Sequence, residues 1–167
     1  MNSQNIFRFL FSSAFSILFI ASLAGQKNID QVLRKYKNDD GVVNLNFTGD
    51  VKKYLQSANV KLESEIDNID VLIFEKSKNI SSKDEKQINE TLIKEGFDLL
   101  VDVRNKGEKV KLHVLESGNF LSKVFAHIES EESNIYFTIT GKIKLDELSK
   151  LNLNFDGSEA LKMAGKK

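Results

Sequence analysis

The clearest pattern in the chain is an alternation of apolar and polar residues that runs from Phe97 to about Gly141. Three segments interrupt it, at residues 105–108, 117–119 and 131–133, and each is built from polar residues and glycine. A period of two is typical of β-strands with one buried face, and short polar breaks are typical of hairpin turns. The pattern therefore predicts a four-stranded antiparallel meander.

The spacing also indicates which residues should pair across two of these turns. Around the first turn three apolar pairs face each other: Val103 with Val110, Val101 with Leu112, and Leu99 with Val114. Around the last turn three more do so: Ile128 with Ile135, Ala126 with Phe137, and Val124 with Ile139. A shift of one residue would turn every one of these side chains to the other face. We therefore expect these residues to form the inward, buried face of the meander.

Apolar residues at helical spacing predict four helices around the meander. These helices are expected at residues 28–36, 51–58, 82–95 and 145–151. In the third helix, Ser82 and Glu85 have the spacing of a capping box, in which the two side chains bond to backbone N–H groups of the first turn. Its apolar residues Ile88, Leu92 and Ile93 are expected to point inward.

Two further segments, residues 42–47 and 69–74, predict strands that precede the meander. In the first, Val43, Leu45 and Phe47 alternate with residues of the opposite face. The fold class expected is α+β: a four-stranded antiparallel meander extended by one or two N-terminal strands, with helices packed mainly on one face. No internal repeat or linker is long enough to divide the chain, so residues 25–151 are expected to form a single domain and residues 152–167 a C-terminal tail.

The first 24 residues have the features of a secretory signal peptide. Arg8 is followed by the largely apolar residues 9–21, and the small residues Ser22 and Ala24 flank Leu23. A basic start, an apolar middle and small residues before the cut are the three parts of such a signal. We predict cleavage after Ala24, with cleavage after Gly25 as the alternative, a periplasmic or secreted location, and no membrane span in the mature protein.

The composition excludes several kinds of functional site. The chain has 167 residues, no Cys and no Pro, and its 24 Lys and Arg residues balance 24 Asp and Glu residues. Without Cys there can be no disulfide, no thiol nucleophile and no lipid anchor of the bacterial lipoprotein type. A balanced charge argues against nucleic-acid binding, since such surfaces are strongly basic.

Catalytic motifs are not evident in the sequence. Its two histidines, His113 and His127, fall on the strand face opposite the inward residues, and Glu129 is the nearest carboxylate that could join them. A zinc site needs three or four converging ligands, and the expected pairing sets His113 opposite Lys123 or Phe125 instead of His127. We therefore predict no catalytic residues, no bound cofactor and no metal site, and a metal-dependent hydrolase using both histidines remains the less favoured alternative.

One set of apolar residues falls on the face opposite the inward residues of the meander. This set is Leu100, Leu115, Leu121, Phe125 and Tyr136. Exposed apolar patches mark interaction sites in many proteins. The sequence therefore suggests an interaction face, while a covering N-terminal helix or tail is an equal alternative.

Four stretches together resemble a known family. They are Leu33-Arg34-Lys35-Tyr36 with Gly41-Val42 after a signal peptide, Leu92-Ile93-Lys94-Glu95-Gly96-Phe97, Gly107-Glu108-Lys109-Val110-Lys111-Leu112, and Gly141-Lys142-Ile143-Lys144-Leu145-Asp146-Glu147-Leu148. Over residues 27–151 the chain resembles the family of the domain of unknown function 4252, small exported proteins of Gram-negative bacteria. The resemblance implies an α+β domain in the cell envelope and brings no catalytic residues with it. Many relatives look like lipoproteins, and this chain lacks the cysteine that they need.

The function expected from the sequence is that of a non-catalytic, exported envelope protein that binds another envelope protein or a second copy of itself. A carrier of a small ligand or lipid between the sheet and the helices is the main alternative. A well-formed apolar cavity would favour the carrier.

Overall fold

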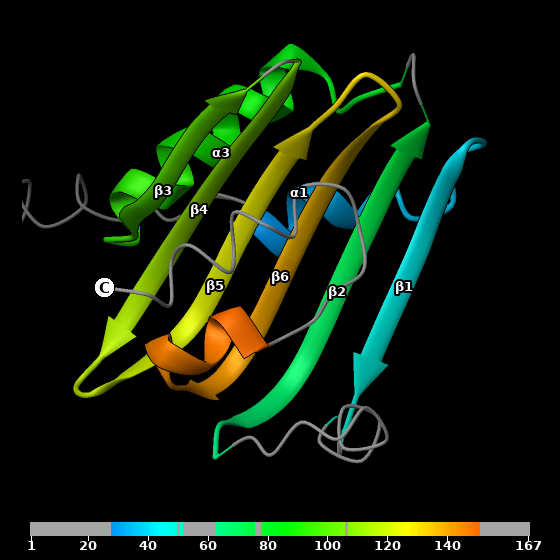
Figure 1. Ribbon diagram of the computed structural model, residues 1–167. Coiled ribbons are helices and arrows are strands. Elements are labelled where there is room, and N and C mark those ends of the chain that lie inside the picture. Colours follow the sequence, from blue (N-terminus) through cyan, green and yellow to red (C-terminus); the bar gives the residue numbers. More distant parts are fainter. Residues whose placement is uncertain (1–27, 50, 52–62, 76–77, 106, 151–167) are drawn as a thin grey trace, which may run out of the picture.

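The computed structural model describes residues 28–49, 51, 63–75, 78–105 and 107–150 (Figure 1). The expected signal peptide and C-terminal tail lie outside these residues. So does most of the helix expected at residues 51–58, of which only the buried Val51 is described.

The fold is α+β, built on one open antiparallel sheet of six strands. The strands are β1 (Val42–Thr48), β2 (Glu65–Glu75), β3 (Asp98–Asn105), β4 (Glu108–Ser117), β5 (Phe120–Glu129) and β6 (Ser133–Ile143). Their order across the sheet is β1-β2-β6-β5-β4-β3, so β1 and β3 form its two edges (Figure 1). The N-terminal pair β1–β2 therefore joins the sheet through β6, the last strand in sequence.

The pairing expected around the last turn is confirmed, with Ile128 opposite Ile135 and the other two pairs as predicted. Around the first turn, Val103 pairs with Val110 and Val101 with Leu112, but the third pair is wrong. Leu99 lies opposite His113, because the register shifts between Leu99 and Val101. An extra residue in one strand unpairs the ladder locally and turns the residues beyond it to the other face.

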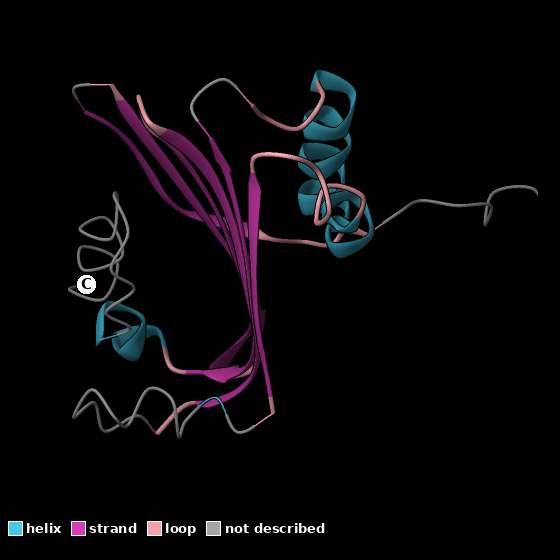
Figure 2. Ribbon diagram, turned by 90° about the vertical axis from the view of Figure 1, so that its right-hand side faces the viewer, coloured by secondary structure: helices cyan, strands magenta, loops and turns pink. Residues whose placement is uncertain are grey.

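Helices α1 (Ile29–Arg34) and α3 (Ser82–Lys94) cover one face of the sheet, and the short 3-10 helix η1 (Leu145–Lys150) lies on the opposite face (Figure 2). We call these two surfaces the helix face and the η1 face. The N-cap of α3 is Ser81, one residue earlier than predicted, since its side chain accepts the N–H of Asp84 at 3.2 Å. Ile93 is 81% exposed, although Ile88 and Leu92 are buried as expected, because Ile93 lies one residue, or about 100°, around the helix from Leu92.

Two separate apolar cores result, one on each face. The core of the η1 face is mostly aliphatic and contains the inward residues that the alternation predicted, such as Leu112, Ala126 and Ile139. The core of the helix face contains Phe125 and Tyr136 from the strands. Helices α1 and α3 therefore cover the face that the sequence analysis took as the outer one.

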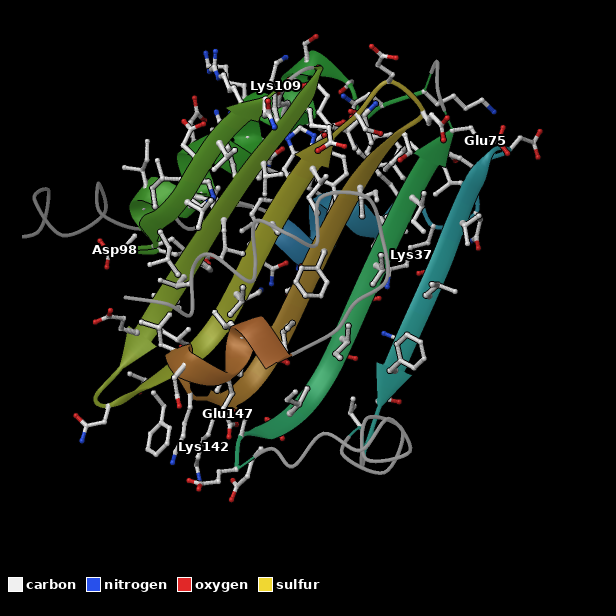
Figure 3. All side chains as sticks on the ribbon, viewed as in Figure 1. Lys37, Glu75, Asp98, Lys109, Lys142 and Glu147 are labelled. Carbon is white, nitrogen blue, oxygen red and sulfur yellow. The ribbon has the colours of Figure 1, made fainter. Side chains whose placement is uncertain are left out.

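The η1 helix is held to the start of β2 by a buried carboxylate. The side chain of Glu147, 3% exposed, accepts the backbone N–H groups of Glu63 and Ser64 at 2.9 and 2.8 Å and the Ser64 hydroxyl at 2.6 Å. Figure 3 shows Glu147 beside Lys142 at this end of the sheet. Next to it, Gly141 cannot be replaced freely, because a Cβ there would lie 2.1 Å from the carbonyl oxygen of Glu65.

Candidate interaction surface

The most exposed row of apolar side chains on a strand lies along the edge strand β1. Val43, Leu45 and Phe47 are 48%, 41% and 39% exposed, and we call them the β1 row. They pair with Ile73, Val71 and Ile69 of β2, which belong to or pack against the core of the η1 face. Because paired residues of an antiparallel sheet share a face, the β1 row extends that core outward to the sheet edge.

The outer edge of β1 has features that favour the addition of another strand. Among the described residues β1 pairs with β2 alone and is the last strand of the sheet. Its seven residues, Val42–Thr48, carry no charge. Exposed strand edges are normally protected from such pairing by charged residues, proline or bulges.

The opposite edge of the sheet is protected in that way. Strand β3 carries Asp98, Asp102 and Arg104, and its pairing with β4 contains the bulge near Leu99. The two edges therefore differ in chemistry, and only the β1 edge combines an uncharged strand with an exposed apolar row.

The interaction face expected from sequence is not a single exposed surface. Phe125 and Tyr136 are each 2% exposed and lie in the core of the helix face, where the partly buried Leu115 packs against them. Leu121 is 4% exposed and belongs to the core of the η1 face, against which Leu100 also packs. The expectation of one surface is corrected for two reasons. Helices α1 and α3 cover this side, and bulges in β3 and β5, each against β4, turn Leu100 and Leu121 to the other face.

The two histidines lie side by side on the helix face, under α3. His113 pairs with Phe125 and His127 with Lys111 on the neighbouring strand. The ring of His127 stacks on Tyr136, with ring centres 4.3 Å apart. Burial lowers the pKa of both imidazoles, so both rings favour the neutral form.

These histidines do not converge with Glu129. The Glu129 carboxylate instead pairs with Lys109, at 2.9 Å from its Nζ atom, on the sheet surface. The described residues contain no group of three or more His, Cys, Asp or Glu side chains placed to hold a metal ion. Instead the Nδ1 atom of His113 and the Nε2 atom of His127 are buried without a hydrogen-bond partner among the described residues.

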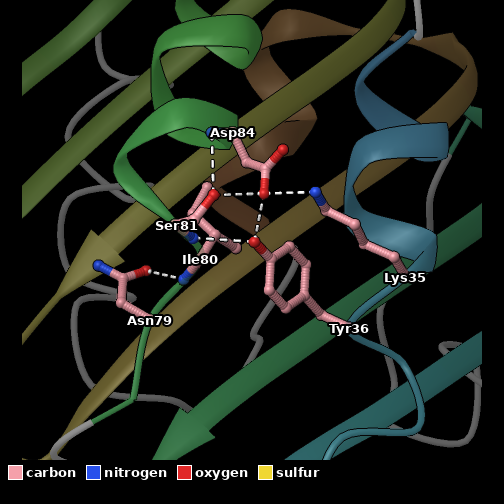
Figure 4. Close-up of polar contacts among 6 residues, drawn as sticks. All are labelled: Lys35, Tyr36, Asn79, Ile80, Ser81 and Asp84. Carbon is pink, nitrogen blue, oxygen red and sulfur yellow. Dashed lines mark hydrogen bonds and ion pairs between the residues drawn. The ribbon is translucent and has the colours of Figure 1, made fainter.

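A polar cluster joins the two helices of the helix face (Figure 4). The Asp84 carboxylate, at the start of α3, accepts hydrogen bonds from the Tyr36 hydroxyl and from Ser81 Oγ, the latter at 2.5 Å, and forms an ion pair with Lys35. Burial alone would raise the pKa of Asp84, but hydrogen bonds from Lys35, Ser81 and Tyr36 outweigh it and lower the pKa from 3.8 to about 2. The contacts of Tyr36 and Lys35 fasten the chain after α1 to the start of α3, and the Ser81 contacts cap α3, so the cluster has a structural role.

Depressions in the surface offer little to an apolar small ligand. Those that border α1 and α3 on the helix face have volumes of about 40 and 20 Å³, far below the roughly 300 Å³ that begins to hold a drug-sized ligand. A larger one of about 400 Å³ lies near η1. Its walls include the ion pair of Lys142 with Glu65 and that of Lys144 with Glu63, so the carrier alternative gains no support from it.

Fold and surface together define the class of protein: an α+β domain with an open antiparallel sheet and one apolar, uncharged edge. Residues 36–151 match the model of the family described as domain of unknown function DUF4252, and the chain belongs to that family. No curated protein and no solved structure matches the chain. Within the described part of the chain, none of the helices has the length and apolar character needed to cross a membrane.

The sequence itself carries a signal for the β1 row. The alternation of Val43, Leu45 and Phe47 predicted the strand, and the absence of charge from residues 42–48 was visible beside it. What the sequence alone does not show is that this strand forms an edge of the sheet, because that follows from the pairing of β2 with β6.

Proposed function

We propose that this protein is an exported, non-catalytic binding module of the cell envelope, and that it binds through the β1 row and the outer edge of β1. The observation that carries the proposal is the exposure of Val43, Leu45 and Phe47 on an uncharged edge strand. A partner strand that adds to such an edge gains backbone hydrogen bonds along its length and apolar contacts at every second residue.

The class of partner follows from the same surface. The β1 row offers apolar contacts, and the other face of β1 carries the amides of Asn44 and of Asn46, whose Nδ2 atom already donates to Asn68 at 3.2 Å. An extended segment that alternates apolar and uncharged polar residues matches both faces, whereas a charged segment would lose hydration without gaining an ion pair. We therefore propose an extended, uncharged segment of another envelope protein as the partner.

The binding surface is tested by cross-linking in the cell that makes the protein. A photo-activated amino acid replaces Leu45 in one variant and Lys86 in a control, since the Lys86 side chain on α3 is 79% exposed. We expect a cross-linked product with another envelope protein from position 45 and none from position 86. Equal products from both positions, or no product with another protein from position 45, would contradict the proposal.

The exported location rests on the N-terminal sequence, with Arg8, the apolar residues 9–21 and the small residues before Gly25. Cell fractionation followed by N-terminal sequencing tests it. We expect the protein outside the inner membrane with Gly25 as its first residue. An intact N-terminus in the cytoplasmic fraction would overturn this part of the proposal.

We do not propose the metal-dependent hydrolase as a second function. Its third ligand, Glu129, is paired with Lys109 on the surface, and the rings of His113 and His127 lie under α3 with Phe125 and Tyr136. No specific observation favours a reaction at this place over simple packing.

A further inference from the structure

The sequence of β1 occurs twice in the chain. Residues 43–49 read Val-Asn-Leu-Asn-Phe-Thr-Gly, and residues 151–157 read Leu-Asn-Leu-Asn-Phe-Asp-Gly. Five of the seven positions are identical, and the other two exchange Val for Leu and Thr for Asp. The second copy begins at residue 151, the last residue that matches the family, and it is too short to form a structural unit of its own.

The second copy begins close to the surface formed by the first. Residue 151 directly follows η1, which lies on the η1 face together with the β1 row. Leu148 of η1 is 1% exposed and belongs to the core of that face. In Figure 1 the C-terminal end of η1 lies on the side of β2, the strand next to β1. Neighbouring strands are about 5 Å apart, so the outer edge of β1 lies about 10 Å beyond β2. At about 3.3 Å per extended residue, Leu153, the third residue after η1, is the first that can pair with that edge.

The two copies complement each other as neighbouring strands. If Leu153 lies opposite Leu45, the flanking asparagines meet asparagines and the outer apolar residues meet apolar residues, in a parallel or an antiparallel pair. Paired amides and paired apolar side chains stabilise adjacent strands. Residues 43–48 and 151–155 contain no charged side chain, so no charge loses its hydration when the two segments pair.

We propose that the second copy binds as an additional strand along the outer edge of β1 in the same molecule, with residues 151 and 152 crossing from η1 and residues 153–157 pairing with β1. The inference rests on the proposed function only for the location of the binding surface. A second molecule's β1 would offer similar complementarity, but a segment tethered on the same face has an effective concentration of about millimolar. The tail would then be the protein's own ligand, which an external partner must displace.

Hydrogen exchange of the purified, full-length chain tests the proposal, because the outer amides of β1 are protected only if another strand pairs with them. Leu153 and Phe155 are both changed to Asp, and a control variant carries Leu161→Asp and Met163→Asp in the same tail, outside the repeat. We expect amides of β1 to exchange at least about tenfold faster in the first variant than in wild type, with β5 and β6 unchanged. The control should match wild type.

A synthetic peptide with the sequence of residues 150–158 completes the test. Added to the Leu153→Asp and Phe155→Asp variant, it should restore the protection of β1, whereas a scrambled peptide should not. Unchanged exchange of β1 in the variant, or no restoration by the peptide, would overturn the inference. Protection that rises with protein concentration in wild type and variant alike would also overturn it, in favour of a second molecule. None of these results depends on a cross-link to another protein in the cell, so the inference and the proposed function can fail separately.

Discussion

The two faces of the sheet are constructed differently. The helix face is covered by α1 and α3 over a core rich in aromatic rings, in which Phe74 packs edge-on against Tyr136 with ring centres 5.6 Å apart. The polar end of one of these rings is also satisfied within the core, since the Tyr136 hydroxyl donates a hydrogen bond to the Asn79 side chain at 2.7 Å. The η1 face has an aliphatic core that continues outward to the exposed β1 row.

This difference shows how one small sheet can combine a stable core on one face with an exposed binding surface on the other. The helix face is closed by large buried side chains and by the Asp84 cluster, so changes there should affect folding. The β1 row is about half exposed, so changes there should affect binding far more than folding. The predictions below test this contrast, beginning with the largest expected effect.

The largest loss of stability should follow from Phe125→Ala on the helix face. Phe125 is 2% exposed, and truncation of a buried Phe costs about 3–5 kcal/mol in the free energy of unfolding. Denaturant unfolding of the purified protein measures it. Phe120→Ala is the matched control, because Phe120 is 39% exposed and should lose less than about 1 kcal/mol. If the two variants lost similar amounts of unfolding free energy, the proposed difference between buried and exposed positions would be wrong.

A smaller loss is expected at the buried anchor of the η1 face. Glu147→Ala leaves the buried N–H group of Ser64 and the part-buried one of Glu63 without their acceptor, and one buried group left unsatisfied costs about 1–3 kcal/mol. We expect a loss in that range by denaturant unfolding, with faster hydrogen exchange at the start of β2. The exposed control Glu90→Ala on α3 should leave both measurements unchanged. No loss in Glu147→Ala would show that η1 is not held by this carboxylate.

The Asp84 cluster should make stability depend on acid pH. The pKa of Asp84 is about 2 in the folded protein against an ordinary value of 3.8, so folding favours the charged carboxylate. Its contribution is therefore present above about pH 4 and lost as the pH falls to about 2. This contribution is roughly 2 kcal/mol. Between pH 5 and pH 2, the free energy of unfolding should depend less steeply on pH for Asp84→Asn than for wild type.

The control for this prediction is Asp102→Asn, because Asp102 is more exposed and lies on the edge strand β3. Its pH dependence should follow that of wild type. If Asp84→Asn also follows wild type, the cluster in Figure 4 does not stabilise the folded protein through its charge.

The parts of the fold that were predictable follow from local rules. The register of Ile128 with Ile135 follows from the period of two together with the short turn at residues 131–133, because the turn length fixes which apolar residues meet. The first helix was expected to begin at residue 28, and the Asn28 side chain caps it by accepting the N–H of Gln31 at 2.8 Å. Both features depend only on residues close together in the sequence.

The parts that were not predictable depend on long-range packing. The bulge that places Leu99 opposite His113 has no marker in the sequence, and it moves Leu99 and Leu100 to unexpected faces. Phe125 beside Ala126, and Tyr136 beside Phe137, make both faces of β5 and β6 apolar, so the pattern alone does not say which face the helices cover. For the same reason Phe125 and Tyr136 were expected on an interaction face, although they belong to a core.

The central claim is that the β1 row serves binding and is dispensable for folding. The most direct test is the free energy of unfolding of the Leu45→Lys variant, measured by denaturant beside wild type and Phe125→Ala. Leu45 is 41% exposed, so we predict a loss of less than about 1 kcal/mol, together with loss of the cross-linked partner when Leu45→Lys is combined with a photo-activated residue at position 43. A loss as large as that of Phe125→Ala would show that the β1 row is part of the core and would contradict the account.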